Sequence, residues 1–486
     1  MTLTWSAVLA ELRRADLLRS AAASGPDPAS LGVDSRAAIP GMLYLAVRGS
    51  QSDGHQFVAD AIRRGATAVL VEAPQQAGVP EIVVHDSRRA ALVLGGAWYG
   101  HPERDLTLVG VTGTNGKTTT TGLIRHLFNG QETAGSIGTL GAFDGKGEPV
   151  SSTAGSLTTP GPIDLQATLA SLVSRGATHV IMETSSHSLD QGRLDGVTFA
   201  AAVFTNLTRD HLDYHGTMEA YLAAKLRLSA LLRLDGVEVV NLDEDAWRSI
   251  PRRSPRLTFG FHPAADVRAS EVALNASGST FHLNGRFGGA QVALPLLGDF
   301  NVANALAAAA TALALQMPVD RIVKRLSTAP QVPGRMERIS DTPCIVLRDY
   351  AHTPDALERA LTALRPLTRG RLIVVFGAGG DRDRGKRPLM GRIAAELSDL
   401  AIVTSDNPRT ENPEAIIDDI EQGMGSLPHQ RVTDRLAAIH AALNEARAGD
   451  TLLLAGKGHE TYQVIGTEKL PFDEREIVQE AVGGEK

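Results

Sequence analysis

A glycine-rich segment from Gly110 to Thr120 carries the residue types of a phosphate-binding loop. A β-branched run leads into glycines 110, 113 and 116, and Lys117 and Thr118 then open a helical pattern. Backbone N–H groups at such a turn can surround phosphate oxygens, the lysine reaches the β- and γ-phosphates, and the threonine hydroxyl binds Mg²⁺. Strict P-loop spacing wants glycine at 111, where this chain has valine. The segment is therefore a P-loop variant and predicts binding of a nucleoside triphosphate.

Two other segments supply carboxylate, histidine and lysine side chains. Glu183 follows the apolar run THVIM, where a carboxylate can hold Mg²⁺, although an acid at a helix start is an ordinary alternative. His211 and His215 stand four apart, but a zinc enzyme needs a third firm ligand and the chain has no HExxH. Lys225 lies in an Ala/Leu-rich helical pattern, where a lysine is usually exposed to solvent.

Three unrelated function classes share some residue types or motifs with this chain. The stretch 184–189, TSSHSL, has the residue types of a serine hydrolase but lacks the GxSxG elbow. GAGG at 377–380 follows a strand, as in dinucleotide oxidoreductases, but the full GxGxxG and its distal acid are absent. A regulatory nucleotide-binding module without catalysis is disfavoured because the lysine, carboxylate and histidine types of a reaction site are all present.

Short apolar runs alternating with helical patterns must position these residues. Eight runs are continuous rather than alternating, which is typical of strands buried on both faces of a parallel sheet. Functional residues are then expected just past the carboxyl ends of those strands. Turn residues at 275–279 and 284–289 predict a small β-excursion, and the first 18 residues predict an amphipathic helix. The eight predicted strands lie within 107–113, 178–184, 201–207, 237–243, 343–351, 371–379, 400–406 and 451–458.

Composition limits the setting in which the protein works. The 486 residues carry 48 basic and 55 acidic side chains, a net charge of −7, and only 4% are aromatic, which argues against nucleic acid as a partner. The single cysteine, Cys344, excludes an internal disulfide and fits a reducing compartment. Neither a signal peptide nor a run of about 20 apolar residues is visible. We therefore expect a cytoplasmic protein without a membrane span.

Nine motifs, spread in order over essentially the whole chain, resemble the Mur ligase family, and more narrowly its MurE branch. Together they are highly specific, although several are weak singly. The motifs are GTNGKTT, TTP, METSSHSLDQGRL, FTNLTRDHLDYHGTMEAYLAAK, GDFNVANALAA, DYAHTPDAL, GAGGDRDRGKRPLM, SDNPRTENP and GKGHETYQ.

The resemblance implies an α/β fold with three domains. With boundaries placed from the proline- and glycine-containing connections, we predict a smaller α/β domain for the uridine nucleotide at 1–104. A central P-loop ATPase domain with a mostly parallel sheet follows at 105–332, and a Rossmann-like domain for the amino acid at 333–486. The implied reaction is ATP-dependent addition of meso-2,6-diaminopimelate to UDP-MurNAc-L-Ala-D-Glu, through an acyl phosphate, in peptidoglycan precursor synthesis. We expect a monomer.

The resemblance also assigns residues to ATP and Mg²⁺. Lys117, Glu183, His211 and Lys225 form the implied catalytic set, with Lys225 carbamylated on its side-chain nitrogen so that an anion replaces an ammonium beside the metal. Thr118 and Glu183 would hold one Mg²⁺, and Glu183, His211 and modified Lys225 a second. The implied ATP-binding residues are Gly113, Thr114, Asn115, Gly116, Lys117, Thr118, Thr119, Asn301 and Asp349.

The other two substrates have implied residues of their own. One set would bind the uridine nucleotide and its muramoyl-dipeptide: Val33, Ser35, Ser50, Gln51, Ser52, Thr158, Thr159, Ser185, Gln191 and Arg193. A second set would bind the diamino acid: Arg382, Asp406, Asn407, Pro408, Arg409, Gly456 and Glu460.

The DNPR form of the second set favours diaminopimelate over lysine. Diaminopimelate carries a far-end carboxylate that the guanidinium of Arg409 can bind bidentately, while Glu460 takes the ammonium. Lysine would leave Arg409 facing a like charge. As an ordinary alternative, Arg409 is a surface arginine. An L-lysine-adding ligase of the same branch, another Mur ligase and a folylpolyglutamate synthetase-type ligase remain alternatives.

Overall fold

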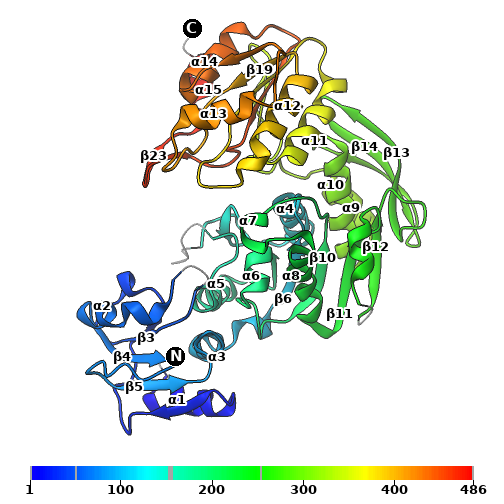
Figure 1. Ribbon diagram of the computed structural model, residues 1–486. Helices are drawn as coiled ribbons and strands as arrows, with labels where there is room; N and C mark the ends of the chain where they lie inside the picture. Colours follow the sequence, from blue (N-terminus) through cyan, green and yellow to red (C-terminus); the bar gives the residue numbers. More distant parts are fainter. Residues whose placement is uncertain (1–2, 50–51, 151–156, 252–253, 484–486) are drawn as a thin grey trace.

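Three separate β-sheets follow one another along the chain, with the central one lying between the other two (Figure 1). The computed structural model describes residues 3–49, 52–150, 157–251 and 254–483. Within these ranges, no helix is both long enough and apolar enough to cross a membrane. The predicted domain boundaries near 104 and 332 fall between the last strand of one sheet and the first of the next, and they stay predictions.

The N-terminal sheet has five strands in the order β1-β5-β4-β3-β2. Helix α1 (Trp5–Arg14) confirms the predicted amphipathic helix, since it buries Trp5, Val8, Leu9 and Leu12. Helix α3 (Ser87–Tyr99) contributes to the same core, and α2 (Val58–Arg63) contacts β4. The strands are β1 (Leu18–Ala21), β2 (Ser30–Gly32), β3 (Met42–Leu45), β4 (Ala66–Val71) and β5 (Glu81–Val84).

The central sheet has ten strands in the order β15-β14-β13-β12-β11-β10-β6-β9-β7-β8. The run from β13 to β7 is parallel, and β8, β14 and β15 are antiparallel to their neighbours. The strands are β6 (Thr107–Thr112), β7 (Ala134–Gly138), β8 (Gly141–Phe143), β9 (His179–Glu183), β10 (Phe199–Phe204), β11 (Leu232–Asn241), β12 (Arg256–Gly260), β13 (Val267–Asn275), β14 (Gly278–Gly285) and β15 (Ala290–Leu294).

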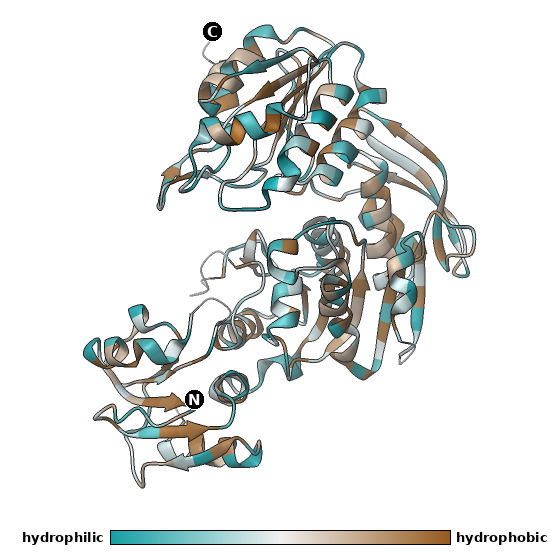
Figure 2. Cartoon of the chain, in the orientation of Figure 1, coloured by the Kyte–Doolittle hydropathy of each residue, from teal (hydrophilic) through white to brown (hydrophobic). Residues whose placement is uncertain are grey.

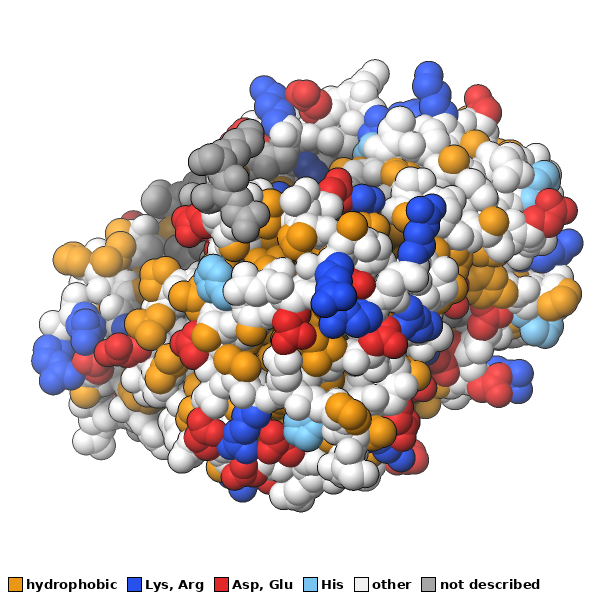
Figure 3. Space-filling view, turned by 90° about the horizontal axis from the view of Figure 1, so that it is seen from above, with side chains coloured by type: hydrophobic (Ala, Val, Ile, Leu, Met, Phe, Trp, Pro, Cys, Tyr) orange, Lys and Arg blue, Asp and Glu red, His pale blue; other side chains and the backbone are white. Residues whose placement is uncertain are grey.

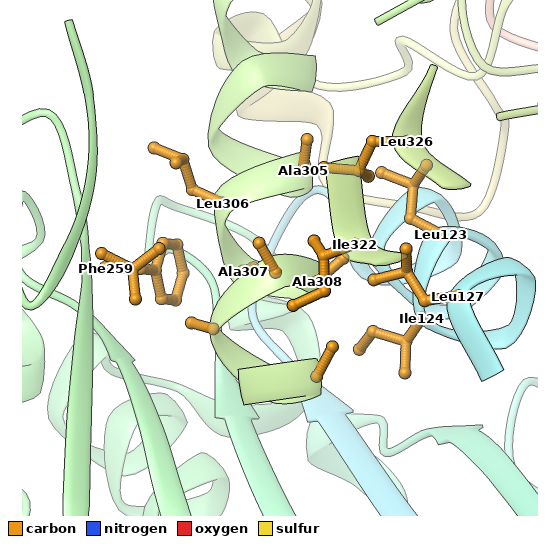
Figure 4. Close-up of a cluster of buried hydrophobic side chains, with 14 of the residues drawn as sticks. Leu123, Ile124, Leu127, Phe259, Ala305, Leu306, Ala307, Ala308, Ile322 and Leu326 are labelled. Atoms are coloured by element: carbon orange, nitrogen blue, oxygen red, sulfur yellow. The ribbon is translucent and has the colours of Figure 1, made fainter. Parts of the chain in front are cut away.

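The two faces of the central sheet are covered by different helices. One apolar cluster is formed by α4 (Lys117–Phe128), α9 (Asp299–Ala314) and α10 (Val319–Leu326). The small alanines of α9 let α4 and α10 pack close to it (Figure 4). Burial of this cluster fixes the direction of α4, which carries the phosphate loop at its start. The remaining central helices are α5 (Pro162–Ser174), α6 (Ser186–Asp190), α7 (Leu212–His215) and α8 (Met218–Ala230).

The C-terminal sheet has six strands in the order β16-β17-β21-β18-β19-β20, parallel except at β16, and a separate hairpin pairs β22 with β23. The strands are β16 (Glu337–Ser340), β17 (Ile345–Asp349), β18 (Leu372–Phe376), β19 (Leu400–Val403), β20 (His429–Arg431), β21 (Thr451–Ala455), β22 (Tyr462–Ile465) and β23 (Glu468–Pro471). The helices are α11 (Pro354–Leu364), α12 (Arg387–Leu397), α13 (Pro413–Glu421), α14 (Arg435–Glu445) and α15 (Glu474–Gly483).

All eight runs that were predicted to be strands are strands, and they pair in parallel as expected. The predicted β-excursion is the β13–β14–β15 meander, whose turns fall at the two turn-rich stretches. Hydrophobic residues follow the strands in Figure 2, and hydrophilic ones follow the outer loops and outer helix faces. The α/β fold class is confirmed.

Candidate functional site

The phosphate loop lies at the carboxyl end of β6, between the ends of β9 and β10. Register fixes this neighbourhood, since Val111 pairs with Glu183 and Thr112 pairs with Phe204. The valine that departs from P-loop spacing is fully buried in β6, so the turn itself begins only at Gly113. The sequence departure therefore lies in the strand and leaves the loop intact.

Side chains that directly follow β10 brace the loop. Asn206 Oδ1 accepts from Asn115 N (2.8 Å), and Thr205 Oγ1 donates to Asn115 O (2.8 Å). Gly113 has φ 150°, and a Cβ there would lie 1.9 Å from Thr205 Oγ1, so only glycine fits. Neither brace was among the residues assigned from the sequence. Their position directly after a buried parallel strand is the signal that could have identified them.

Lys117 turns back over the loop, where Nζ donates to the carbonyl oxygens of Gly113 (3.0 Å) and Thr114 (2.8 Å). Burial lowers its pKa below the ordinary value, against the attraction of Glu183 and Asp210. A lysine held this way keeps its ammonium at the mouth of the loop, where phosphate oxygens are expected.

Glu183 ends β9 with a carboxylate that is almost fully buried. Thr139 binds both oxygens, with N donating to Oε1 (2.9 Å) and Oγ1 donating to Oε2 (3.0 Å). A Cβ at Gly138 would lie 2.3 Å from Oε1, so that glycine gives the carboxylate its space. The carboxylate is therefore fixed in direction before any ligand binds.

Lys225 departs from the ordinary expectation for a helix lysine, because only 1% of it is exposed. Its Nζ donates to Gly113 O (2.7 Å) and lies 4.3 Å from the centre of the Tyr221 ring. Burial, reinforced by repulsion from Lys117 and opposed by Asp210, lowers its pKa well below the usual value. Helix α8 thus places the Lys225 side chain behind the phosphate loop, away from solvent.

His211 begins α7 in the left-handed conformation, with φ 54°. Its Nε2 lies 3.4 Å from Asp210 Oδ2. Burial lowers the pKa of His211 to about 4, although the Asp210 carboxylate acts to raise it. The charges of Lys117 and His352 add to the lowering. The imidazole is therefore neutral at pH 7 and can offer a nitrogen lone pair.

Of the two implied Mg²⁺ positions, the one formed by Thr118 and Glu183 has ligand atoms that suit Mg²⁺ better than the one that includes His211 and Lys225. Thr118 Oγ1 and the Glu183 carboxylate are oxygen donors, which Mg²⁺ prefers. A lysine amine is no ligand for Mg²⁺, so Lys225 fits only if it carries a carbamate. Among the described residues, no three His, Cys, Asp or Glu side chains are grouped to hold a metal ion.

A cavity of about 580 Å³ opens from the phosphate loop toward the C-terminal sheet. Asn301 and Asp349 line it, as do most of the other residues predicted to bind ATP or metal. Asn301 Nδ2 donates to Leu297 O (2.7 Å), and Asp349 accepts from Met336 N (2.6 Å), while burial raises the pKa of Asp349 to about 6. The cavity wall thus comes from two of the three sheets.

Polar contacts join the central and C-terminal sheet units beside the phosphate loop. Asn115 Nδ2 donates to Asp355 Oδ2 (2.9 Å), and Arg335 Nη2 donates to Thr118 Oγ1 (3.1 Å). Asp355 and Arg335 were not assigned from the sequence, because they lie more than 200 residues from their partners. Only the folded chain brings them to the phosphate loop.

The predicted diamino-acid residues form a cluster of their own at the carboxyl ends of the C-terminal strands. Asn407 Nδ2 donates to Glu460 Oε2 (2.8 Å), and a Cβ at Gly456 would lie 3.0 Å from Asp406 Oδ2. Gly379 separates Arg409 from Arg382, since its Cβ would lie 2.9 Å from Arg409 Nη1 and 3.9 Å from Arg382 Cγ. Arg409 is half-buried, which differs from the ordinary surface alternative.

The predicted muramoyl-dipeptide residues join into one network beside Glu183. Thr159 Oγ1 donates to Glu183 O (2.8 Å), and Arg193 Nη1 donates to Thr159 O (3.1 Å). Ser185 caps α6 by accepting from Ser188 N, which is the contact of a structural hydroxyl rather than of a hydrolase nucleophile.

The predicted uridine residues lie apart from this network, on the N-terminal sheet domain. Val33 and Ser52 are exposed, and Ser35 is buried. Ser50 and Gln51 lie outside the described residues. Arg88 connects the two regions, since its Nη1 donates to Gln191 O (2.6 Å).

Fold and site together define a nucleotide-dependent enzyme with three α/β sheet units. Three family models match the chain in order: "Mur ligase family, catalytic domain" at 29–95, "Mur ligase middle domain" at 111–312 and "Mur ligase, glutamate ligase domain" at 334–458. The chain therefore belongs to the Mur ligase family, whose members are ATP-dependent carbon–nitrogen ligases and use Mg²⁺.

Curated relatives extend this similarity over nearly the whole length. The chain is 48% identical over 466 residues to the UDP-N-acetylmuramoyl-L-alanyl-D-glutamate–2,6-diaminopimelate ligase of Gloeobacter violaceus, covering 94% of each chain. It is 43% identical over 471 residues to the protein of the same name from Geobacillus kaustophilus, covering 94% of this chain and 95% of the relative. A solved structure with that name aligns with TM-score 0.67 and 34% identity, covering 100% of this chain and 99% of that one. MurF from Acinetobacter baumannii, at 21% identity and TM-score 0.67 over 94% of this chain and 96% of that one, shares the fold.

Proposed function

We propose that this protein adds meso-2,6-diaminopimelate to the D-glutamyl carboxylate of UDP-MurNAc-L-Ala-D-Glu, with cleavage of ATP to ADP and phosphate. The observation that carries the proposal is the half-buried Arg409 beside the Asn407–Glu460 pair. A guanidinium and a carboxylate in one side-chain cluster match the far-end carboxylate and ammonium of diaminopimelate. The curated relatives with this printed name support the same substrate.

The proposed reaction has two covalent steps. A glutamyl carboxylate oxygen attacks the γ-phosphorus, and ADP leaves. The amine nitrogen then attacks the acyl carbon, and phosphate leaves with the oxygen that it received from the carboxylate while the amine loses a proton. Two anions must meet in the first step, so Lys117 supplies charge at the phosphate loop.

One Mg²⁺ held by Thr118 and Glu183, and a second held by Glu183, His211 and modified Lys225, would neutralise phosphate charge. The lowered pKa of Lys225 supports its modification, because the neutral amine is the form that attacks CO₂. That attack forms an N–C bond and releases one proton to water, which leaves an anionic carbamate. The carbamate then offers oxygen ligands where an ammonium would repel a cation.

The three substrates are assigned to separate regions in this proposal. The uridine nucleotide contacts the N-terminal residues Val33, Ser35 and Ser52, the dipeptide contacts the Thr159–Arg193 network, and ATP lies in the interdomain cavity with its adenine near Asn301 and its ribose near Asp349. The domain limits 1–104, 105–332 and 333–486 are part of the proposal. So are a monomeric state and a cytoplasmic location, where ATP and UDP-linked precursors are available.

A substrate panel tests the proposed specificity. Phosphate release is measured with ATP, Mg²⁺ and UDP-MurNAc-dipeptide, adding diaminopimelate, lysine or ornithine in turn. We expect turnover that depends on the dipeptide substrate and is strongest with diaminopimelate. Equal turnover with lysine would contradict the pocket assignment and favour the lysine-adding alternative.

Isotope transfer tests the acyl phosphate separately. With oxygen-18 in the D-glutamyl carboxylate, one labelled oxygen is expected in each inorganic phosphate that is released. Product formation without label in the phosphate would refute the carboxylate as the phosphoryl acceptor.

A further inference from the structure

Lys457 is a fully buried lysine in the C-terminal domain, directly after Gly456 at the end of β21. Its Nζ lies 3.0 Å from Asn407 Oδ1, 3.4 Å from Asp406 Oδ1 and 3.6 Å from Glu460 Oε2. A buried ammonium needs such partners, because an unpaired charge in the protein interior is costly. All three contacts are with residues of the proposed diamino-acid pocket, which come from two separate loops.

The contacts of Asn407 show what Lys457 controls. Asn407 Oδ1 accepts from Lys457 Nζ and also from Val464 N (2.9 Å), so both donors fix the amide with its oxygen toward them. The amide nitrogen is thereby directed to Glu460, where Nδ2 donates to Oε2 (2.8 Å). Reversal of the amide would place its N–H groups against the ammonium and against a backbone N–H.

Lys457 also offsets the negative charges of two neighbouring carboxylates. Asp406 and Glu460 are two like charges near each other, and Lys457 lies close to both. Burial acts to raise the pKa of Asp406, but Lys457 and Arg435 hold it below the ordinary value. Burial raises the pKa of Glu460, and the Asn407 hydrogen bond and Lys457 oppose that rise.

We propose that Lys457 is a positioning residue for the diamino acid. It joins the 406–409 segment to the 456–460 loop and keeps Glu460 oriented toward the substrate ammonium. Lys457 has no exposed surface, so it acts through Asn407 and Glu460 and not by touching the substrate. This inference rests on the proposed function, which places the far-end ammonium at Glu460.

Lys457→Met tests the proposal, because methionine keeps most of the side-chain length and removes the charge and the donors. We expect the KM for diaminopimelate to rise about tenfold or more, the equivalent of one lost hydrogen bond to a charged group. The KM for ATP and for the UDP-dipeptide should change less than about twofold, because neither substrate is bound through this cluster. Lys469→Met is the matched control, since Lys469 is an exposed lysine on β23 of the adjoining hairpin.

A second variant, Lys457→Gln, keeps an N–H donor for Asn407 without the charge and guards against loss of folding in the methionine variant. We expect a smaller rise in the same KM, with a melting temperature near that of the parent protein. An unchanged KM for diaminopimelate in a folded variant, equal rises for all three substrates, or two variants that both fail to fold would overturn the proposal. If the parent protein itself uses no diamino acid, the proposed function fails instead, and the two failures are distinct.

Discussion

Replacement of Arg409 by lysine is expected to separate the shape of the cation from its charge. The guanidinium donates through Nη1 to Gly380 O (2.7 Å). This hydrogen bond fixes one side of the guanidinium and leaves its other N–H groups for a substrate carboxylate. Lysine keeps the positive charge but offers a point donor that cannot bind both carboxylate oxygens in one plane. The predicted loss is therefore one hydrogen bond to a charged group.

The backbone at Arg409 should survive that substitution. Arg409 N donates to Val464 O (3.1 Å), and Gly466 N donates to Arg409 O (2.7 Å), so the β22–β23 hairpin holds this residue from both sides. Its φ of 51° lies in the left-handed region, where arginine and lysine carry the same steric cost. A change in activity then reports on the side chain and not on a displaced loop.

A hydrogen bond to a charged group contributes about 1.5–3 kcal/mol, which converts to a fall in kcat/KM for diaminopimelate of about 10- to 150-fold. Steady-state kinetics with each substrate varied in turn measures this, and the KM for ATP should stay within about twofold. Arg392→Lys on α12 is the control, since that arginine is exposed. An unchanged KM for diaminopimelate in Arg409→Lys would refute bidentate recognition.

Three other outcomes are expected. Lys225→Ala should lower kcat at least about 100-fold, as loss of one preorganised charged group does, and added bicarbonate should restore part of it in the phosphate-release assay, whereas full activity would exclude a metal-bridging role. Thr118→Val should raise the Mg²⁺ concentration that gives half-maximal activity, and an unchanged Mg²⁺ titration would remove Thr118 from the metal site. The third outcome concerns Glu411, whose pKa is lowered to about 2 mainly by the hydrogen bond that Arg387 donates to it. Because that folded-state pKa is depressed from 4.5, the stabilisation is present above about pH 4.5 and is lost as the pH falls toward 2. Glu411→Gln should therefore lower stability by about 1–2 kcal/mol at pH 7 in urea unfolding, with less difference from the parent at pH 2–3.

The sequence predicted the parallel strands well, because a strand covered on both faces has no polar side and its apolar run shows through. It predicted less well where a strand leaves that environment. Strand β11 begins at Leu232, ahead of the predicted run at 237. The prediction missed its first residues because several are exposed, including Arg233 and Asp235. An exposed strand end of this kind is not distinguished from a loop when only hydropathy is considered.

Residue chemistry near the strand ends was predictable, but burial was not. Composition alone favoured an exposed Lys225, and only the packing of α8 behind the phosphate loop shows that its amine is enclosed. Lys457 gave no signal either, since its partners Asp406 and Asn407 lie about 50 residues away and belong to another strand end. Such contacts arise from sheet topology, which brings β19 and β21 to the two sides of β18.

The charge distribution fits small-molecule substrates better than an extended polyanion. On the face shown in Figure 3, basic and acidic side chains are intermingled, and neither sign forms a continuous area. Cationic groups that matter for the proposed chemistry are instead enclosed, as with Lys117 in the cavity and Lys457 beneath the diamino-acid cluster. Enclosure strengthens each charge and limits its reach to ligands that enter the site.

The interdomain cavity makes nucleotide binding and domain placement depend on each other. The central and C-terminal sheet units meet beside the phosphate loop through the contacts Asn115–Asp355 and Arg335–Thr118. Each of these hydrogen bonds has one charged partner and contributes about 1.5–3 kcal/mol, and Thr208 Oγ1 adds a further contact to Asp355 Oδ2 (3.3 Å). A nucleotide in the cavity would touch Lys117 on one side and Asp349 on the other, adding contacts in only one relative placement. In the proposed reaction, its binding free energy would favour that placement and bring the proposed diamino-acid cluster to a fixed position relative to the activated carboxylate.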